Sequence, residues 1–177
     1  MKLRFRDLNP KVVEAVAVAF ADIPAFDVKC ADVFEGAPAD AIVSPANSHG
    51  WMDGGIDLVY RDRFGLAIET NLQALIAGLP TKLLAVGEAI ILDTGDEQIP
   101  AMIAAPTMEV PSVVAQTDNA YLAFRAVLRA VRHVNFQSVI CPGLATLTGR
   151  MAPQESAQQM RRAWDELMGL VPAHPTQ

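Results

Sequence analysis

Two short glycine-containing segments hold the side chains most able to do chemistry. In the first, residues 44–57 (SPANSHGWMDGGID), Asn47 offers a hydrogen-bond donor and an acceptor on one side chain, and Asp57 offers a carboxylate. Gly54 and Gly55 lie between them, and glycine allows a backbone to turn tightly and to approach a ligand closely. A helix is predicted directly after the glycine pair, and its free N–H groups and positive dipole end attract anions. This segment therefore predicts a site for a diphosphate.

The second segment, residues 142–150 (PGLATLTGR), follows a short apolar run and combines glycine with threonine hydroxyls. Backbone N–H groups and hydroxyls can surround phosphate oxygens without a lysine, so an anionic ligand is compatible with an acidic protein. The patterns G-x-x-x-x-G-K-[ST] and G-x-G-x-x-G do not occur in the sequence. Ordinary nucleotide-hydrolase and Rossmann sites therefore lack their motif.

Each of these residues also has a structural explanation. A glycine pair is common in plain turns, and an aspartate at a helix start, such as Asp57, can simply complement the helix dipole. Asn47 can cap a turn or a helix, and Asp32 can be a solvated turn residue. His49 and Trp51 lie in the same loop and can line a pocket, although a loop histidine usually has no chemical role. The residues alone leave both interpretations open.

The elements that must position these segments alternate between strand and helix. Strands are predicted at residues 2–8, 26–30, 41–43, 83–92, 101–105 and 138–141, and helices at 10–20, 56–64, 66–79, from Thr117 or Asp118 through 131, and 153–168. The polar alternation of residues 2–8 predicts an edge strand, and the apolar run at 41–43 predicts a central one. Residues 83–92 and 101–105 are expected to pair as a hairpin.

This order predicts one α/β domain over residues 1–177, a three-layer α/β/α sandwich with a mixed central sheet. In such folds ligands bind beyond the carboxyl ends of central strands. Both glycine-containing segments follow predicted strands, at 41–43 and 138–141. We therefore expect the two segments to form one site.

The composition is that of an acidic globular domain, with 51% hydrophobic residues, 19% charged residues and a formal net charge of -6. Such a charge argues against a nucleic-acid footprint. No apolar run approaches the length of a membrane span, and the first residues lack the apolar core of a signal peptide, so a cytoplasmic location is expected. Cys30 and Cys141 lie in apolar contexts without metal-ligand spacing, which predicts reduced structural thiols and no metal or cofactor.

The sequence VSPANSHGWMDGGID resembles the signature of the macro domain family, in which a strand delivers an asparagine, a glycine-rich loop and an acidic residue at a helix start. A short strand that ends in Cys30-Ala31-Asp32-Val33 precedes it, and Pro-Gly-Leu-Ala-Thr-Leu-Thr-Gly stands where the family has a phosphate loop. The resemblance extends over residues 26–164. The segments SPANS and MDGGID are most similar to the sequences of a bacterial and phage-associated branch of this family.

The resemblance implies binding of ADP-ribose or of an ADP-ribosylated substrate. Asp32 would accept a hydrogen bond from the adenine amino group, and Asn47 would face the hydroxyls of the distal ribose. Thr146, Thr148 and Gly149 would hold the diphosphate. The implied ligand-binding residues are Asp32, Val33, Ala46, Asn47, His49, Gly54, Gly55, Ile56, Gly143, Ala145, Thr146, Leu147, Thr148, Gly149 and Arg150.

By the same resemblance, Asp57 stands where the hydrolytic branch has an aspartate that helps to activate water near the anomeric carbon. Asn47 and Asp57 are then the implied catalytic pair of an ADP-ribosyl hydrolase. The chain departs from the family pattern, because the usual Asn-Ala-Ala-Asn is Ser-Pro-Ala-Asn at residues 44–47. A reader module without chemistry and a phage-like structural protein that has lost the pocket are the alternatives. The sequence gives no indication of the oligomeric state.

Overall fold

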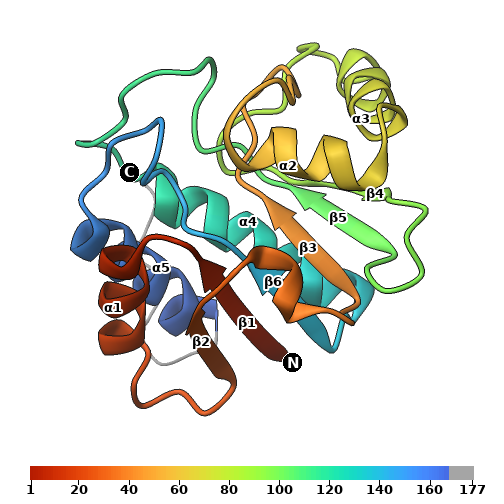
Figure 1. Ribbon diagram of the computed structural model, residues 1–177. Coiled ribbons are helices and arrows are strands. Elements are labelled where there is room, and N and C mark those ends of the chain that lie inside the picture. The colour runs from red at the N-terminus through yellow and green to blue at the C-terminus, as the bar shows by residue number, and fades with distance from the viewer. Residues whose placement is uncertain (168–177) are drawn as a thin grey trace.

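The computed structural model describes residues 1–167, in which a six-stranded sheet lies between two layers of helices (Figure 1). The strands are β1 (Lys2–Asp7), β2 (Phe26–Cys30), β3 (Ala41–Ser44), β4 (Ile90–Asp93), β5 (Ala101–Ala104) and β6 (Ser138–Cys141). The helices are α1 (Pro10–Ala19), α2 (Gly55–Phe64), α3 (Ala67–Ala77), α4 (Asn119–Val134) and α5 (Pro153–Leu167), with a short 3-10 helix η1 (Val33–Gly36). The predicted three-layer sandwich is confirmed.

The sheet has the strand order β2-β1-β6-β3-β5-β4. Neighbouring strands are parallel, except that β4 and β5 form the predicted antiparallel hairpin. β4 begins only at Ile90 rather than at residue 83, because the chain turns before it and Gly87 there has a φ of +98°. β3 lies inside the sheet with all its residues buried, as predicted.

The prediction of an edge strand at the N-terminus is wrong. β1 lies between β2 and β6, and β2 forms that edge of the sheet. Arg6 is buried and pairs with Asp27, with 2.7 Å between Nη2 and Oδ2, and Arg4 donates to the carbonyl oxygens of Gly36 and Pro38. Because buried cations are tolerated when they are paired and hydrogen-bonded, the polar alternation marks arginines held by protein acceptors and not a solvated face. Nε of Arg6 is the exception, since it is buried without a partner within residues 1–167.

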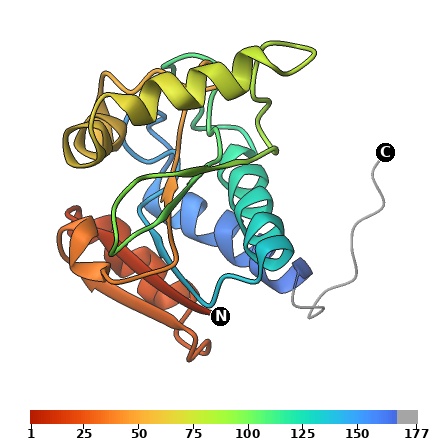
Figure 2. The same ribbon diagram turned by 90° about the vertical axis from the view of Figure 1, so that its right-hand side faces the viewer.

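The two helical layers bury opposite faces of the sheet. Neighbouring strand residues point to opposite faces, and on β3 Val43 joins one apolar cluster while Ile42 joins the other. The cluster of Val43 includes Phe124 of α4 and packs α1, α4 and α5 on one face (Figure 2). The cluster of Ile42 includes Tyr60 of α2 and Leu72 of α3. Burial on both faces explains the continuous apolar run of this strand.

Most helix boundaries follow their local signals. α1 begins at the predicted proline, and Asn9 caps it by accepting the N–H of Lys11 at 3.1 Å. At the start of α4, Thr117 Oγ1 accepts the N–H of Asn119 at 3.2 Å, whereas the side chain of Asp118 makes no capping bond. α5 is described through Leu167, so residue 168, the predicted last residue of this helix, lies outside the described residues.

The two cysteines occupy different environments, and both are free thiols. Cys141 is buried in β6, where burial raises the pKa of its thiol. Cys30 is exposed on the edge strand, so the apolar context predicted for it is wrong. Within residues 1–167, no helix is long and apolar enough to cross a membrane. Over the same residues, no group of three His, Cys, Asp or Glu side chains is placed to hold a metal ion.

Candidate functional site

A cleft of about 690 Å³ opens where β1, β3, β5 and β6 reach their carboxyl ends. Its walls come from segments that follow these four strands, within residues 7–9, 45–47, 107–111 and 142–149, together with residues 31–33 after β2 and the start of α2. The loops after β3, β5 and β6 gather at one edge of the sheet (Figure 1). Parallel strands place their carboxyl ends at the same edge, which is why segments distant in sequence meet here.

The structure brings nearly all the sequence-predicted residues to this cleft. Asp57 and all the predicted ligand-binding residues line it, except His49 and Arg150. His49 instead stacks on Trp51, with ring centroids 4.3 Å apart, and Trp51 lines the cleft. Arg150 is exposed at the end of its loop. Position in a loop does not determine which side chains point inward, so these two predicted contacts have no support from the geometry.

Two parts of the cleft are not among the residues that the sequence predicts. Residues 6–9, at the end of β1, and Thr107, Met108 and Pro111, after β5, also line it. Neither part contains a glycine pair or a recognisable motif. These residues could have been found from their position after a strand, because every parallel strand inside such a sheet brings the loop that follows it to the same edge.

The first glycine loop is shaped for close approach of a ligand. Gly54 is extended and precedes α2, and Gly55, the first residue of α2, has a φ of +58°, which favours glycine. A Cβ added to Gly55 would meet only Leu147 Cδ2 of the second loop, 3.8 Å away. The two loops therefore face each other. The first N–H groups of α2 have no acceptor inside the helix, so they are available to an anion.

The second glycine loop is tightly folded around Ala145. The carbonyl oxygen of Ala145 accepts the N–H of Met151 at 2.9 Å, and Ala145 itself has a φ of +60°, uncommon for a residue with a side chain. A Cβ on Gly149 would lie 2.5 Å from this oxygen, so only glycine fits. The N–H groups of residues 146–149 donate to no acceptor within residues 1–167. Their arrangement suits an anionic ligand.

Gly143 contributes to the cleft through a different arrangement. Its N–H donates to Asp7 Oδ2 at 3.0 Å, and the other carboxylate oxygen of Asp7 accepts the N–H of Asn9 at 2.8 Å. A Cβ on Gly143 would lie 2.6 Å from Asp7 Oδ2. Asp7 thus joins the ends of β1 and β6, and the N–H of Gly143 is already used within the protein.

Asn47 organises its own loop. Its Oδ1 accepts the N–H groups of His49 at 3.1 Å and of Trp51 at 3.2 Å, and its Nδ2 donates to the carbonyl oxygen of Trp51 at 2.8 Å. The side chain is buried and lines the cleft. Two N–H groups belong to Nδ2, so one of them remains for a ligand. The turn-capping explanation of Asn47 is therefore confirmed, and a ligand contact is compatible with it.

Asp57 places a buried carboxylate in the first turn of α2. It is 8% exposed, and its Oδ1 accepts a hydrogen bond from Ser44 Oγ at 2.6 Å. Burial raises the pKa of Asp57 from its ordinary value of 3.8 to about 6, against the opposing hydrogen bond from Ser44, and Glu69 raises it further. A carboxyl group with a pKa close to neutral can exchange a proton under ordinary conditions, as a general acid or base must.

Asp32 lines the cleft just after the edge strand β2, whereas Asp57 lies in the helix that follows the inner strand β3. Its Oδ1 accepts the N–H of Phe34 at 2.8 Å and so caps η1. The side chain is exposed. No donor within residues 1–167 contacts Oδ2, which leaves that oxygen to accept a hydrogen bond from a ligand.

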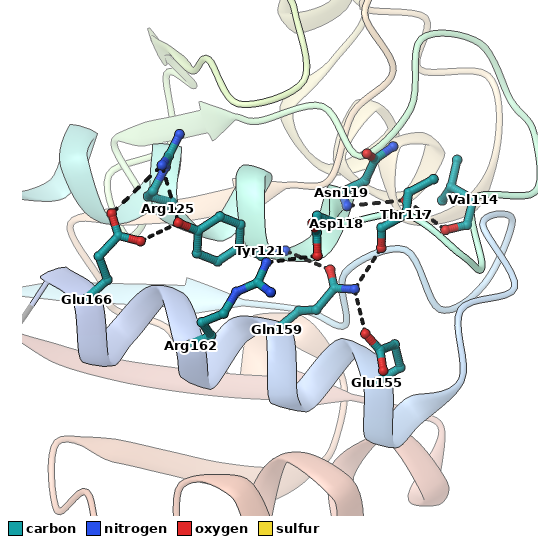
Figure 3. Close-up of polar contacts among 10 residues, drawn as sticks. All are labelled: Val114, Thr117, Asp118, Asn119, Tyr121, Arg125, Glu155, Gln159, Arg162 and Glu166. Atoms are coloured by element: carbon teal, nitrogen blue, oxygen red, sulfur yellow. Dashed lines mark hydrogen bonds and ion pairs between the residues drawn. The ribbon is translucent and has the colours of Figure 1, made fainter. Parts of the chain in front are cut away.

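A polar network fixes the segment between β5 and α4 against the second glycine loop. Val114 donates its N–H to the carbonyl oxygen of Gly149 at 2.9 Å, and Thr117 Oγ1 donates to the carbonyl oxygen of Val114 at 2.8 Å. Gln159 of α5 then donates through Nε2 to the carbonyl oxygen of Thr117 at 2.7 Å (Figure 3). The helical layer of α4 and α5 is thereby connected to the wall of the cleft.

Comparison with known proteins agrees with this geometry. The sequence model of the family described as "Macro domain" matches residues 43–160. An uncharacterized protein of Aquifex aeolicus is 33% identical over 122 residues, which cover 69% of this chain and 70% of the relative.

Among solved structures, the macrodomain of Mycobacterium tuberculosis DarG has a TM-score of 0.65 at 23% identity and covers 77% of this chain and 87% of its own. A mutant Oceanobacillus iheyensis macrodomain with ADPR has a TM-score of 0.62 at 20% identity and covers 71% and 69%. At these identities the structures share the fold. The family model, which matches about two thirds of the sequence, carries the assignment, and the chain belongs to the macro domain family.

Proposed function

We propose that the cleft binds ADP-ribose, or the ADP-ribosyl group of a substrate, and that the protein hydrolyses an ADP-ribosyl linkage. The observation that carries the binding is the pair of facing glycine loops, whose backbone N–H groups at residues 146–149 and at the start of α2 donate to no acceptor in the described part of the chain, residues 1–167. Two such loops on one cleft suit a diphosphate better than a single phosphate. Family membership and the neighbouring macrodomain with ADPR support the same ligand.

The cleft is large enough for a complete ligand of this class. Its volume of about 690 Å³ lies within the usual range of small-molecule sites, ~300–1,000 Å³. The alternative of a structural protein that has lost the pocket is therefore not supported. In the proposed arrangement Asp32 accepts from the adenine amino group, the glycine loops hold the diphosphate, and Asn47 and Asp57 lie near the distal ribose.

Asp57 supplies the proposed chemistry. Its ionised carboxylate takes a proton from a water molecule while the water oxygen forms a bond to the anomeric carbon of the distal ribose. The bond from that carbon to the acceptor breaks with its electron pair, and the departing acceptor is protonated from solvent. The products are ADP-ribose and the free acceptor. A pKa of about 6 lets Asp57 be mostly ionised at pH 7 and still bind the proton that it takes up.

A reader module is the second candidate, and the position of Asp57 in the first turn of α2 favours it. A carboxylate there stabilises the helix through the dipole without any catalytic role. The free N–H groups would serve a reader as well as an enzyme. Binding and turnover must therefore be measured separately.

The test begins with calorimetric titration of ADP-ribose, ADP and AMP. Equal affinity for ADP-ribose and AMP would contradict the use of both loops and the distal ribose together. Single-turnover release of ADP-ribose from ester-linked and N-linked substrates then follows, with enzyme in excess. Asp57→Ala is expected to keep the dissociation constant within about threefold, because the group acts mainly in the transition state.

Turnover by Asp57→Ala is expected to fall by roughly 10²–10⁴, the usual contribution of a positioned acid or base. Asn47→Ala should weaken both binding and turnover, because it shapes the loop and faces the ligand in the ground state as well. Wild-type turnover by Asp57→Ala would remove the catalytic role from this residue. Tight binding with no release from any substrate would favour the reader.

A further inference from the structure

The side chain of Ser44 contacts Asp57, the residue proposed to activate water. It is the last residue of β3, in the middle of the sheet, and it is fully buried. Its carbonyl oxygen continues the strand pairing by accepting the N–H of Ala105 at 2.9 Å. Its hydroxyl leaves the strand and reaches α2, where Oγ donates to Asp57 Oδ1 at 2.6 Å.

This hydrogen bond makes the two oxygens of the Asp57 carboxylate different, because only Oδ1 accepts it. Oδ1 is held by a group that is fixed in the central strand, and a serine has a single short side-chain torsion to adjust. No donor within residues 1–167 contacts Oδ2, and that atom is not among the fully buried polar atoms without a partner. Because Asp57 lines the cleft, Oδ2 is the oxygen that can meet water or ligand there.

We propose that Ser44 is a positioning residue, which holds Oδ1 of Asp57 and so directs Oδ2 toward the cleft, where the attacking water is bound. The proposal rests on the proposed function and assigns one step of it to a residue outside the glycine loops. Ser44 does not line the cleft. It acts through Asp57 alone.

The charged and titratable groups around Asp57 do not duplicate this contact. Glu69 of α3 raises the pKa of Asp57, and it is itself paired with Arg61 at 3.0 Å. Tyr60 of α2 is fully buried and donates to the carbonyl oxygen of Val43 at 2.9 Å, so its hydroxyl is committed elsewhere. Burial raises the pKa of that tyrosine, and Asp57, Cys141 of β6 and the cleft residues Asp7 and Asp32 raise it further. Ser44 is the donor seen on Asp57 within residues 1–167.

The hydrogen bond has a measurable effect on proton affinity. It stabilises the ionised carboxylate and lowers the pKa of Asp57 against the effect of burial. Removing the donor should therefore raise the pH at which Asp57 ionises, by about one pH unit for a bond to a charged group. A serine that only fills space would leave this midpoint unchanged.

The experiment compares Ser44→Ala and Ser44→Cys with Ser48→Ala as the matched control. Ser48 is also a buried serine close to β3, but its hydroxyl lies near the carbonyl oxygen of Met108, 3.5 Å away, and not near Asp57. The carboxyl carbon of Asp57 is titrated by ¹³C NMR, with Asp57→Asn to assign the signal. Cysteine is a weak donor of similar size, so it tests the contact if alanine leaves the protein unfolded.

We expect the titration midpoint to rise by about one unit in Ser44→Ala, by less in Ser44→Cys, and not at all in Ser48→Ala. On a substrate that the wild type cleaves, the acid limb of the pH–rate profile should move by the same amount. Single-turnover release at pH 7 should fall at least tenfold while the dissociation constant for ADP-ribose stays within threefold. In an Asp57→Asn background, Ser44→Ala should cause no further loss of turnover.

An unchanged midpoint in both Ser44 variants would overturn the proposal, as would an equal loss of turnover from Ser44→Ala with and without Asp57. Failure of this proposal can be distinguished from failure of the proposed function, because the two are measured by different experiments. If the wild type fails to bind ADP-ribose, the proposed function fails, but the NMR titration still decides whether Ser44 controls Asp57.

Discussion

The backbone N–H of Val114 lies 2.9 Å from the carbonyl oxygen of Gly149 and joins the segment after β5 to the second glycine loop. The side chain of Val114 also packs closely against this loop, because a Cβ added to Gly149 would lie 2.7 Å from Val114 Cγ2. The segment after β5 also lines the cleft through Met108 and Pro111. The loop proposed to hold the diphosphate therefore depends on a support that is distant in sequence.

Gln159 is expected to be a key part of that support. It is 4% exposed, accepts the N–H of Tyr121 at 3.1 Å and donates to the carbonyl oxygen of Thr117 at 2.7 Å (Figure 3). Gln159→Leu leaves both backbone groups without their partner, so we expect a loss of about 2–4 kcal/mol in the free energy of unfolding. Urea unfolding measures it, and ADP-ribose affinity should fall as well. Gln158→Leu, at an exposed neighbouring position, is the control and should change neither quantity.

Gly55→Val should impair binding more than folding. Valine at a φ of +58° costs about 1–2 kcal/mol, and its side chain would occupy the space where the loops face each other. Gly95→Val is the matched control, because Gly95 has a φ of +73° and open space around it but does not line the cleft. Calorimetry on both folded variants should show lost affinity only for Gly55→Val. Normal binding by that variant would mean that this loop does not contact the ligand.

Asp32→Asn separates the two roles of this side chain. Asparagine keeps an oxygen to accept the N–H of Phe34, so η1 should remain capped and the thermal midpoint nearly unchanged. The second oxygen becomes an amide NH₂, which cannot accept from the adenine amino group. We expect ADP-ribose binding to weaken by roughly 1.5–3 kcal/mol. Unchanged affinity in calorimetry would show that Asp32 serves only as a cap.

Asp57→Asn is expected to stabilise the fold in a way that depends on pH. The folded-state pKa of about 6 exceeds the ordinary value of 3.8, so the folded protein binds more protons than the unfolded chain between these values. The wild type therefore loses stability as the pH rises from about 4 to 6. Above that range its free energy of unfolding is lowered by the full cost of burying the ionised carboxylate. At pH 7 the variant should gain up to about 3 kcal/mol, and at pH 3.5 almost nothing. A gain that is the same at both pH values in denaturant unfolding would contradict the raised pKa.

The sequence by itself determined the elements and the two glycine loops. The strand at residues 41–44 could be predicted because burial on both faces requires an apolar run, and the start of α1 because proline and asparagine favour a helix start. Gly55 and Gly149 could be placed in loops that line the cleft because glycine is typical of tight turns and close approach, and the structure has a positive φ at Gly55 and crowding at Gly149. The apolar run, the proline and the glycines are features of the local sequence, whereas part of the crowding at Gly149 comes from Val114, which is distant in sequence.

Only the tertiary structure decided which distant residues meet. The place of β1 inside the sheet depends on pairing with residues 26–30 and 138–141, and the polar alternation of Arg4 and Arg6 could not reveal their partners. The bond between Ser44 and Asp57 joins a strand to a helix across the loop between them, and its geometry follows from how α2 packs on the sheet. Side-chain direction, burial and the resulting proton affinity arise from packing over the whole chain, which local sequence patterns do not encode.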